Sequence, residues 1–375
     1  DAYPFYASHA KGAYLWDIDN NRYIDYTLGY GTVVLGHADD RVTQAVIQEL
    51  EKGNNISPLW KPLQVELTKL LTSVIPNGEM AFLMKSGSDA TSGAVRLARV
   101  FTNREKIVRW GYNGWHDWAT PRPGGVPKSI QEDTLKFEYN NIASLRSIFE
   151  RYPEQIACVI MMPFELEKPN PNFLSEVREI AHNYGALFIL DEMRSGFRFA
   201  LGGAQEYFAI QSDLATYSKA MSNGYPISAI VGRADILGRM GQTKMDSTFF
   251  GNAPEMQAAI TTITVLKETR AIPYIWRIGE LFEKGIKDLI TEYNAPAEFA
   301  GYPPYPFIKF TLADENLNEK IKTAFFVETA CSGILFHPNH HWYICAAHTE
   351  ADIAETLSVC RKGFERVHEV IATKA

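Results

Sequence analysis

The feature that most constrains the fold is the alternation of short apolar segments with helical segments from about residue 62 onward. The clearest example is ACVIMM (157–162), followed by FLSEVREIAHNYG (173–185) and ALFIL (186–190). A strand, a helix and a second strand in this order form a βαβ unit, whose strands lie parallel. Because both strands are apolar at nearly every position, each must be covered on both faces. The sequence therefore predicts a three-layer α/β domain with a mostly parallel sheet.

Pattern changes rather than linkers mark the domain boundaries. A chain of 375 residues exceeds what one hydrophobic core usually organises, so we expect a second, smaller domain. Residues 51–276 carry the alternating pattern and form the predicted large domain. Residues 1–50 begin with a predicted hairpin around an Asp-Asn-Asn turn, and residues 277–375 end in an amphipathic helix. We expect these two segments to form a small α+β domain.

The charge balance and the hydropathy pattern disfavour several classes of function. The chain carries 37 Lys and Arg residues against 44 Asp and Glu residues, and its net charge of −7 disfavours binding to nucleic-acid backbones. No apolar run approaches the roughly 20 residues of a membrane-spanning helix, and the first residues lack the order of a signal peptide. The four cysteines form no CxxC pair, which indicates reduced thiols. We therefore expect a cytoplasmic protein without a nucleic-acid or membrane partner.

Ligands of open α/β sheets collect at the carboxyl edge of the strands, so the residues after each predicted strand are candidate site residues. The strand AFLM is followed by Gly87 and Ser88 at the start of a predicted helix. A glycine lets a ligand approach the backbone, and the amides of a helix N-terminus favour an anion such as phosphate. The same residues also fit an ordinary helix start with Ser88 or Asp89 as the N-cap.

Charged and aromatic residues follow three other strands. Asp191 follows ALFIL, where a carboxylate needs a cation or a metal beside it, or an ion pair with Arg194 or Arg198. Lys219 follows DLATYS, where it is either a solvated lysine or an amine whose pKa is lowered so that it acts as nucleophile and general base. The strand KIVRW leads into GYNGWHDW (111–118), whose rings could stack on a flat ligand or pack in the core.

Taken together, these four strand ends match the requirements of pyridoxal phosphate. Its phosphate needs a helix N-terminus, its ring needs flat apolar cover, its aldehyde needs an amine, and its pyridine nitrogen needs a carboxylate to stay protonated. A protonated ring withdraws electrons from the alpha carbon of the substrate. The combination therefore predicts an enzyme that uses pyridoxal phosphate.

The motifs, taken in order, resemble the class III aminotransferases of the pyridoxal-phosphate family, which have fold type I, and most closely the glutamate-1-semialdehyde aminomutase branch. The likeness runs through GAYLWDIDNNRYIDY, VLGH, SGSDAT, RLAR, YNG, YGALFILDEMRSGFR, SKAMSNGYP, STFFGN and AAHT. It implies transfer of an amino group from a donor, with glutamate suggested, to a small keto or aldehyde acceptor. It also implies an obligate homodimer with shared active sites.

The resemblance implies roles for individual residues as well. Lys219 would be the catalytic Schiff-base lysine, and Asp191 would be the catalytic partner of the pyridine nitrogen. The other cofactor contacts that it implies are Gly87 and Ser88 for the phosphate, Tyr112 and Met193 for the two faces of the ring, and Thr248 from the neighbouring subunit.

The substrate pocket is less well defined by the sequence. Tyr30 and His337 lie where the family builds this pocket, although each could equally be a packing residue. A substrate carboxylate would require an arginine, and the sequence does not rank Arg41, Arg198 and Arg233 as candidates.

Departures from the family pattern keep alternatives open. The chain has Asn113 where the family usually has a histidine, and Met162-Pro163 where the branch commonly has Glu-Pro. These departures favour an aminotransferase over the aminomutase, which stays as the first alternative. A non-catalytic binding protein with the same fold is the second.

Two other enzyme classes fit the sequence poorly. A dinucleotide-binding fingerprint in GYGTVVLG would place its third glycine at Val34. A zinc site in HPNHH (337–341) lacks a carboxylate or cysteine at ligand spacing. We therefore expect no metal.

Overall fold

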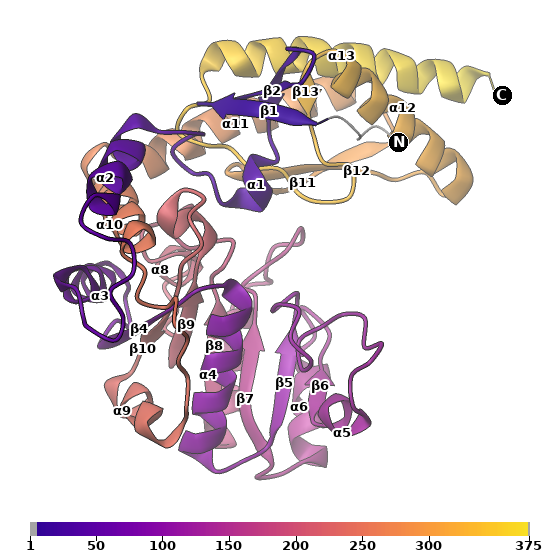
Figure 1. The fold of residues 1–375 in the computed structure, drawn as a ribbon. Coiled ribbons are helices and arrows are strands. Elements are labelled where there is room, and N and C mark those ends of the chain that lie inside the picture. The colour runs from indigo at the N-terminus through magenta and orange to yellow at the C-terminus, as the bar shows by residue number, and fades with distance from the viewer. Residues whose placement is uncertain (1–5, 374–375) are drawn as a thin grey trace. The chain divides into compact units, whose positions relative to one another are not determined.

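A seven-stranded sheet lies at the centre of residues 42–264 in the computed structural model, which describes residues 6–373 (Figure 1). Its strands are β4 (Met80–Met84), β5 (Lys106–Trp110), β6 (Thr134–Lys136), β7 (Ile156–Met161), β8 (Leu187–Asp191), β9 (Leu214–Tyr217) and β10 (Ser228–Gly232). Their spatial order is β4-β10-β9-β8-β7-β5-β6. Neighbouring strands from β9 to β6 run parallel, whereas β10 is antiparallel to both of its neighbours. The predicted mostly parallel sheet is confirmed.

Helices cover this sheet because its central strands are apolar on both sides. Strands β7 to β10 are buried at every position. Helix α4 (Gly87–Thr102) packs on β7 to β10, and α7 (Phe173–Asn183) packs on β7 and β8. The small side chains of Ala94 and Ala98 on α4 join the same buried cluster as Ile160 and Ile189, which lets the helix approach the sheet closely. This arrangement confirms the three-layer fold class.

The remaining helices connect these elements. They are α2 (Asp40–Leu50), α3 (Pro62–Val74), α5 (Lys128–Glu132), α6 (Ile142–Arg151), α8 (Ala204–Tyr207), α9 (Ala234–Leu237), α10 (Ala253–Glu268) and the 3₁₀ helices η1 (Lys219–Ser222) and η2 (Gly238–Gln242). Within residues 6–373, no helix combines the length and apolar character needed to cross a bilayer.

Residues 1–41 and 265–375 make up the other compact unit. Its four-stranded sheet has the order β1 (Ala7–Lys11), β2 (Tyr14–Asp17), β3 (Arg22–Asp25), β13 (Ile334–Leu335), so chain segments from both ends share one sheet. The unit also holds the hairpin β11 (Ala297–Tyr302) to β12 (Tyr305–Phe310) and the helices α1 (Leu28–Gly31), α11 (Ala271–Glu292), α12 (Glu315–Cys331) and α13 (Glu350–Ala372). The sequence placed the domain boundaries at residues 50 and 276, at the end of α2 and inside α11, and these boundaries stay a prediction.

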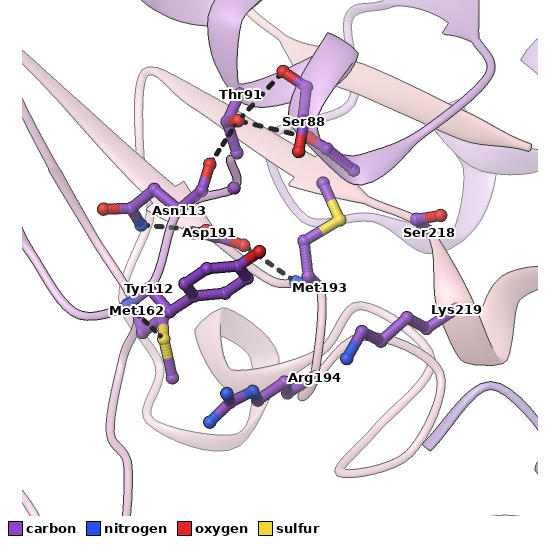
Figure 2. A pocket seen from close by; sticks show the side chains of 12 residues that line it. Ser88, Thr91, Tyr112, Asn113, Met162, Asp191, Met193, Arg194, Ser218 and Lys219 are labelled. Atoms are coloured by element: carbon purple, nitrogen blue, oxygen red, sulfur yellow. Dashed lines mark hydrogen bonds between the residues drawn. The ribbon is translucent and has the colours of Figure 1, made fainter. Parts of the chain in front are cut away.

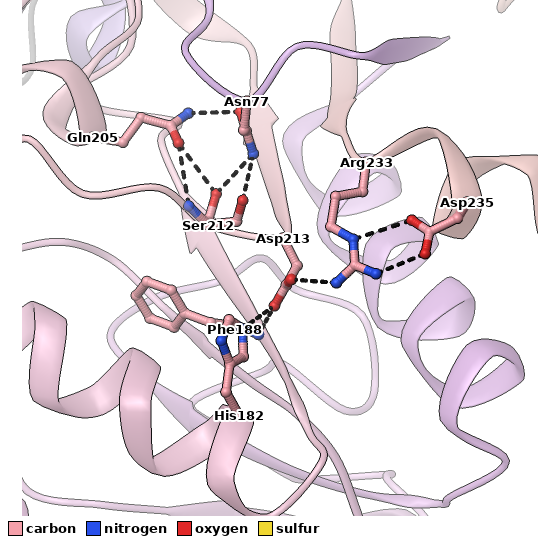
Figure 3. A network of polar contacts seen from close by, with 8 residues as sticks. All are labelled: Asn77, His182, Phe188, Gln205, Ser212, Asp213, Arg233 and Asp235. Carbon is pink, nitrogen blue, oxygen red and sulfur yellow. Dashed lines mark hydrogen bonds and ion pairs between the residues drawn. The ribbon is translucent and has the colours of Figure 1, made fainter.

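A buried carboxylate ties the amino ends of the central strands together (Figure 3). Asp213, which directly precedes β9, is 4% exposed. It accepts hydrogen bonds from the Phe188 amide (2.8 Å), His182 Nε2 (2.7 Å) and Arg233 Nη1 (2.8 Å). One side chain therefore links α7, β8, β9 and the end of β10.

Replacing Asp213 by alanine should lower the free energy of unfolding by about 3 kcal/mol, because it removes three hydrogen bonds and leaves the Phe188 amide buried without an acceptor. Chemical denaturation measures this loss. Asp235→Ala is the matched control, since Asp235 pairs with the same Arg233 but is half-exposed, and its removal should cost less than about 1 kcal/mol. Equal losses of unfolding free energy in the two variants would show that Asp213 does not have this structural role.

Candidate active site

A cavity of about 190 Å³ lies at the carboxyl edge of the seven-stranded sheet (Figure 2). Its lining residues follow the ends of five strands, β4, β5, β7, β8 and β9. They are Gly87, Ser88, Thr91, Tyr112, Asn113, Gly114, Met162, Asp191, Met193, Arg194, Ser218 and Lys219. The structure thus brings together the predicted site residues Gly87, Ser88, Tyr112, Asp191, Met193 and Lys219.

The start of helix α4 forms one end of the cavity. Ser86 is the N-cap in place of the expected Ser88 or Asp89, because its Oγ accepts from the Asp89 amide (3.2 Å) while the Asp89 carboxylate accepts from the Ser86 amide (2.8 Å). Ser88 and Gly87 therefore belong to the first turn, and among the described residues their amides donate to no acceptor. Such amides, at the positive end of the helix dipole, favour an anion.

Glycine keeps this end of the cavity open. A Cβ atom on Gly114, whose φ is +117°, would lie 2.5 Å from Ser88 Oγ. A Cβ atom on Gly87 would lie 3.0 Å from Met193 Sδ. A side chain on Gly114 would collide with Ser88, so the loop after β5 approaches α4 only because this position is glycine. At Gly87, the flexible Met193 side chain would have to shift by a few tenths of an ångström to make room.

Asp191, the last residue of β8, is 2% exposed and has only neutral hydrogen-bond donors. Its Oδ2 accepts from Asn113 Nδ2 (2.8 Å) and its Oδ1 from the Met193 amide (3.1 Å). Among the described residues it forms no ion pair, so the expected structural pairing with Arg194 or Arg198 is not made. Burial raises the pKa of Asp191, while the two donors and nearby positive charges oppose this shift. A buried carboxylate in this state fits a cationic ligand atom.

Asn113 holds Asp191 in place, a role that its sequence position did not indicate. It is 1% exposed, and its carbonyl accepts from Thr91 Oγ1 (2.7 Å), which ties the loop to α4. Its Oδ1 is buried without a partner in the part of the chain that the structure describes. The amide orientation follows from Asp191, because a reversed amide would place two acceptors together. An unpartnered acceptor at this depth is available to a donor on a bound molecule.

Lys219 begins η1 two residues after the end of β9 and has a φ of +47°. This backbone conformation is uncommon for a residue with a Cβ atom, and such strain concentrates at functional sites. Asn223 and Gly224, which also have positive φ values, let the chain turn back, and Ser218 Oγ then donates to the Ile227 carbonyl (2.7 Å). Burial and the positive charge of Arg194 lower the pKa of the Lys219 amine to about 7, although Asp191 opposes the shift.

This lowered pKa gives a pH dependence that can be measured without turnover. The rate at which the apoprotein attaches pyridoxal phosphate should rise about tenfold per pH unit below pH 7 and level off above it, because only the neutral Lys219 amine is a nucleophile. The growth of the visible absorption band measures this rate. In Arg194→Met the midpoint should move to higher pH, since a neighbouring positive charge is lost. A midpoint near that of an ordinary lysine in the unaltered protein would contradict the lowered pKa.

Tyr112 and Met193 give the cavity its flat apolar borders (Figure 2). The Tyr112 side chain is half-exposed, and its backbone amide donates to Met162 Sδ (3.3 Å), which fixes the start of the loop after β5. Met193 is almost buried and lies against Gly87. A planar ring would find apolar contact here.

Three predicted residues do not line this cavity. Thr248 is exposed in the turn before α10, and its carbonyl accepts from Asn55 Nδ2 (3.1 Å). Tyr30 and His337 belong to the other compact unit, where Tyr30 Oη lies 3.5 Å from His337 Nε2. Their predicted roles stay predictions.

The arginines suggested for a substrate carboxylate do not line the cavity either. Arg41 pairs with Asp39 in the other unit, and Arg198 is fully buried. Arg233 pairs with Asp213 and Asp235.

The chain is similar to known proteins over most of its length. The family model of class-III aminotransferases matches residues 1–345. The chain is 37% identical to the 3-aminobutyryl-CoA aminotransferase of Cloacimonas acidaminovorans, with 98% of this chain and 91% of the relative covered. It is 31% identical to the glutamate-1-semialdehyde 2,1-aminomutase of Sulfurihydrogenibium azorense, with 96% and 92% covered.

Solved structures show the same fold. The FumI protein of Sphingopyxis sp. MTA144, in its PLP internal aldimine form, superposes with a TM-score of 0.93 at 28% identity, covering 98% of this chain and 90% of that one. A beta-phenylalanine aminotransferase from Variovorax paradoxus superposes with a TM-score of 0.87 at 27% identity, covering 96% and 87%.

The fold and the site define a pyridoxal-phosphate enzyme of fold type I. The chain belongs to the class-III aminotransferase family, and it is an aminotransferase with pyridoxal phosphate as its cofactor. The predicted family, reaction class and cofactor are confirmed.

Proposed function

We propose that the cavity at the carboxyl edge of the sheet is the active site, with Lys219 and Asp191 as its catalytic residues. The observation that carries this proposal is that one cavity is lined by an amine with a lowered pKa, by a buried carboxylate that forms no ion pair within residues 6–373, and by the N-terminus of α4. The amides of Gly87 and Ser88 would bind the phosphate. Tyr112 would cover one face of the ring and Met193 would lie behind the other.

The bound cofactor supplies an aldehyde that reacts with amines and a protonated ring that accepts electrons from the substrate carbon. With a pKa of about 7, a large share of the Lys219 amine is neutral at pH 7, so Nζ would take a proton from the amine-bearing carbon of the donor and pass it to the bound cofactor. In the second half of the reaction Nζ would carry a proton back from the cofactor to the acceptor carbon. Asp191 keeps the proton on the ring nitrogen, and Asn113 fixes the direction of its Oδ2. Lys219 Nζ would also hold the cofactor between turnovers and release it when an amino donor binds.

We also propose that one substrate carries the transferred amino group on the carbon beta to its carbonyl. Glutamate and 2-oxoglutarate would form the other pair of donor and acceptor. Two relatives support this substrate class, because one is named a 3-aminobutyryl-CoA aminotransferase and the other a beta-phenylalanine aminotransferase. Supplying 3-aminobutanoate or its thioester with 2-oxoglutarate, and following both products by chromatography, tests the proposal. The 3-oxo product and glutamate should appear together.

An aminomutase is the second candidate because several relatives of about the same length carry that name. The same chromatographic experiment separates the two reactions. A single substrate that is isomerised without a separate donor would replace amino transfer by the mutase reaction.

We further propose a homodimer in which Thr248 reaches the phosphate site of the neighbouring subunit. Near Thr248 lies an exposed apolar surface that includes Leu59 (73% exposed), Trp60 (79%) and Phe249 (56%). A cavity of about 240 Å³ is lined by Leu59 and Trp60 and, from the segment around Thr248, by Met245, Asp246, Ser247, Phe250 and Gly251. Clustered apolar exposure of this kind is typical of a protein interface. Sedimentation of the holoenzyme should give twice the chain mass, and Trp60→Asp should yield monomers.

A further inference from the structure

Arg194 is a charged residue of the cavity that the mechanism above leaves without a role. It follows Met193 in the loop after β8, and its side chain, 12% exposed, lines the cavity together with Lys219 (Figure 2). Its positive charge is near enough to contribute to the lowered pKa of the Lys219 amine. A nearly buried cation at this place favours an anionic group on a bound molecule, in addition to the Asp191 carboxylate on which its charge already acts.

One partner of Arg194, the Glu165 carboxylate, is weakly held. Arg194 Nη1 lies 3.2 Å from Oε1 of Glu165, whose side chain is 45% exposed. Pairs with one solvated member contribute little to stability, so the Glu165 carboxylate can be replaced by another at small cost. By contrast, Arg233 is held by two carboxylates, those of Asp213 and Asp235. Among the arginines considered, Arg194 alone combines a place in the cavity with an exchangeable partner.

We propose that Arg194 binds the carboxylate of the amino donor or acceptor by exchange with Glu165, and so selects carboxylate substrates. The inference rests on the proposed function of the cavity. The planar guanidinium of Arg194 presents parallel N–H donors that match a carboxylate, so this contact fixes the orientation of the substrate and contributes to its affinity. If the other substrate is a thioester, which has no free carboxylate, Arg194 would bind a carboxylate of glutamate or 2-oxoglutarate.

Binding of an unreactive analogue tests the proposal without turnover. The probe is 3-methylbutanoate, which has the shape of 3-aminobutanoate but a methyl group in place of the amine. Calorimetry on the holoenzyme should show that Arg194→Met raises its Kd roughly 10- to 100-fold, as expected for a lost charge-assisted hydrogen bond. In Glu165→Gln the Kd should fall about threefold, because the competing carboxylate is gone.

A pair of donors gives a second readout. Decay of the visible band is followed with 3-aminobutanoate and with 2-aminobutane, which carries a methyl group in place of the carboxylate. Loss of Arg194 changes the pKa of the Lys219 amine equally for both donors. The ratio of the two rates therefore reports only the contact with the carboxylate. This ratio should fall roughly 10- to 100-fold in Arg194→Met.

Arg146→Met, at an exposed arginine on α6, is the matched control and should leave both Kd and ratio unchanged. The proposal is overturned if Arg194→Met binds 3-methylbutanoate as tightly as Arg146→Met does, or if Glu165→Gln weakens binding as Arg194→Met should. Failure of the proposed function looks different, since no donor would then bleach the band of the unaltered protein.

Discussion

Lys219→Ala should abolish covalent attachment of pyridoxal phosphate and lower amino transfer by roughly 10⁴-fold, because one amine serves as both nucleophile and proton carrier. The phosphate site at Gly87 and the carboxylate of Asp191 remain, so the cofactor should still bind without a covalent bond. Borohydride reduction followed by mass spectrometry measures attachment, and the donor and acceptor assay measures transfer.

The control for this variant is Lys128→Ala, at an exposed lysine on α5, which should keep both attachment and activity. Cofactor that is reduced onto a different lysine in Lys219→Ala would show that Lys219 does not carry the bond. Activity within tenfold of the unaltered protein would exclude it as the proton carrier.

The strand ends explain why much of the site could be predicted from the sequence. Asp191 is the last residue of β8 and Lys219 lies two residues after the end of β9, and the topology of a parallel sheet brings these positions to one edge whatever the paths of the loops. Gly87 and Ser88 were recognisable for the same reason, since a helix begins just after β4. For these residues, strand order and proximity to the strand end determine position in space.

The remaining cavity residues depend on loop paths, which local sequence patterns do not determine. Asn113 contacts Asp191 only because Gly114 lets its loop approach Ser88. Arg194 lines the cavity because the chain turns at the end of β8. From the sequence alone, an arginine at this position is equally well predicted to lie on the surface. The N-cap was misplaced by two residues or more because Ser86, Ser88 and Asp89 all have suitable side chains, and only the hydrogen bonds distinguish them.

The antiparallel direction of β10 could have been predicted from the length of the connection that precedes it. Residues 218–227 connect β9 to β10, and a parallel connection needs a crossover of about a dozen residues or more. The antiparallel β10 therefore follows from loop length. By contrast, the three-residue β6 and the two-residue β13 are too short for their alternation to be distinguished from loops, so their places in the sheets come from pairing alone.

Asp191→Asn separates the electronic role of the carboxylate from its contribution to binding. Asparagine keeps the shape of the side chain and still accepts from Asn113 Nδ2, but it cannot hold the proton on the ring nitrogen. The rate of amino transfer should therefore fall roughly 10³-fold, while the Kd of the cofactor should rise by no more than about tenfold. The donor and acceptor assay gives the rate, and titration of the visible band gives the Kd. Asp117→Asn, at an exposed carboxylate of the loop after β5, should change neither quantity. Equal losses of rate and affinity in Asp191→Asn would mean that the carboxylate only anchors the ring, since a group that acts on the transition state must affect the rate more than the binding.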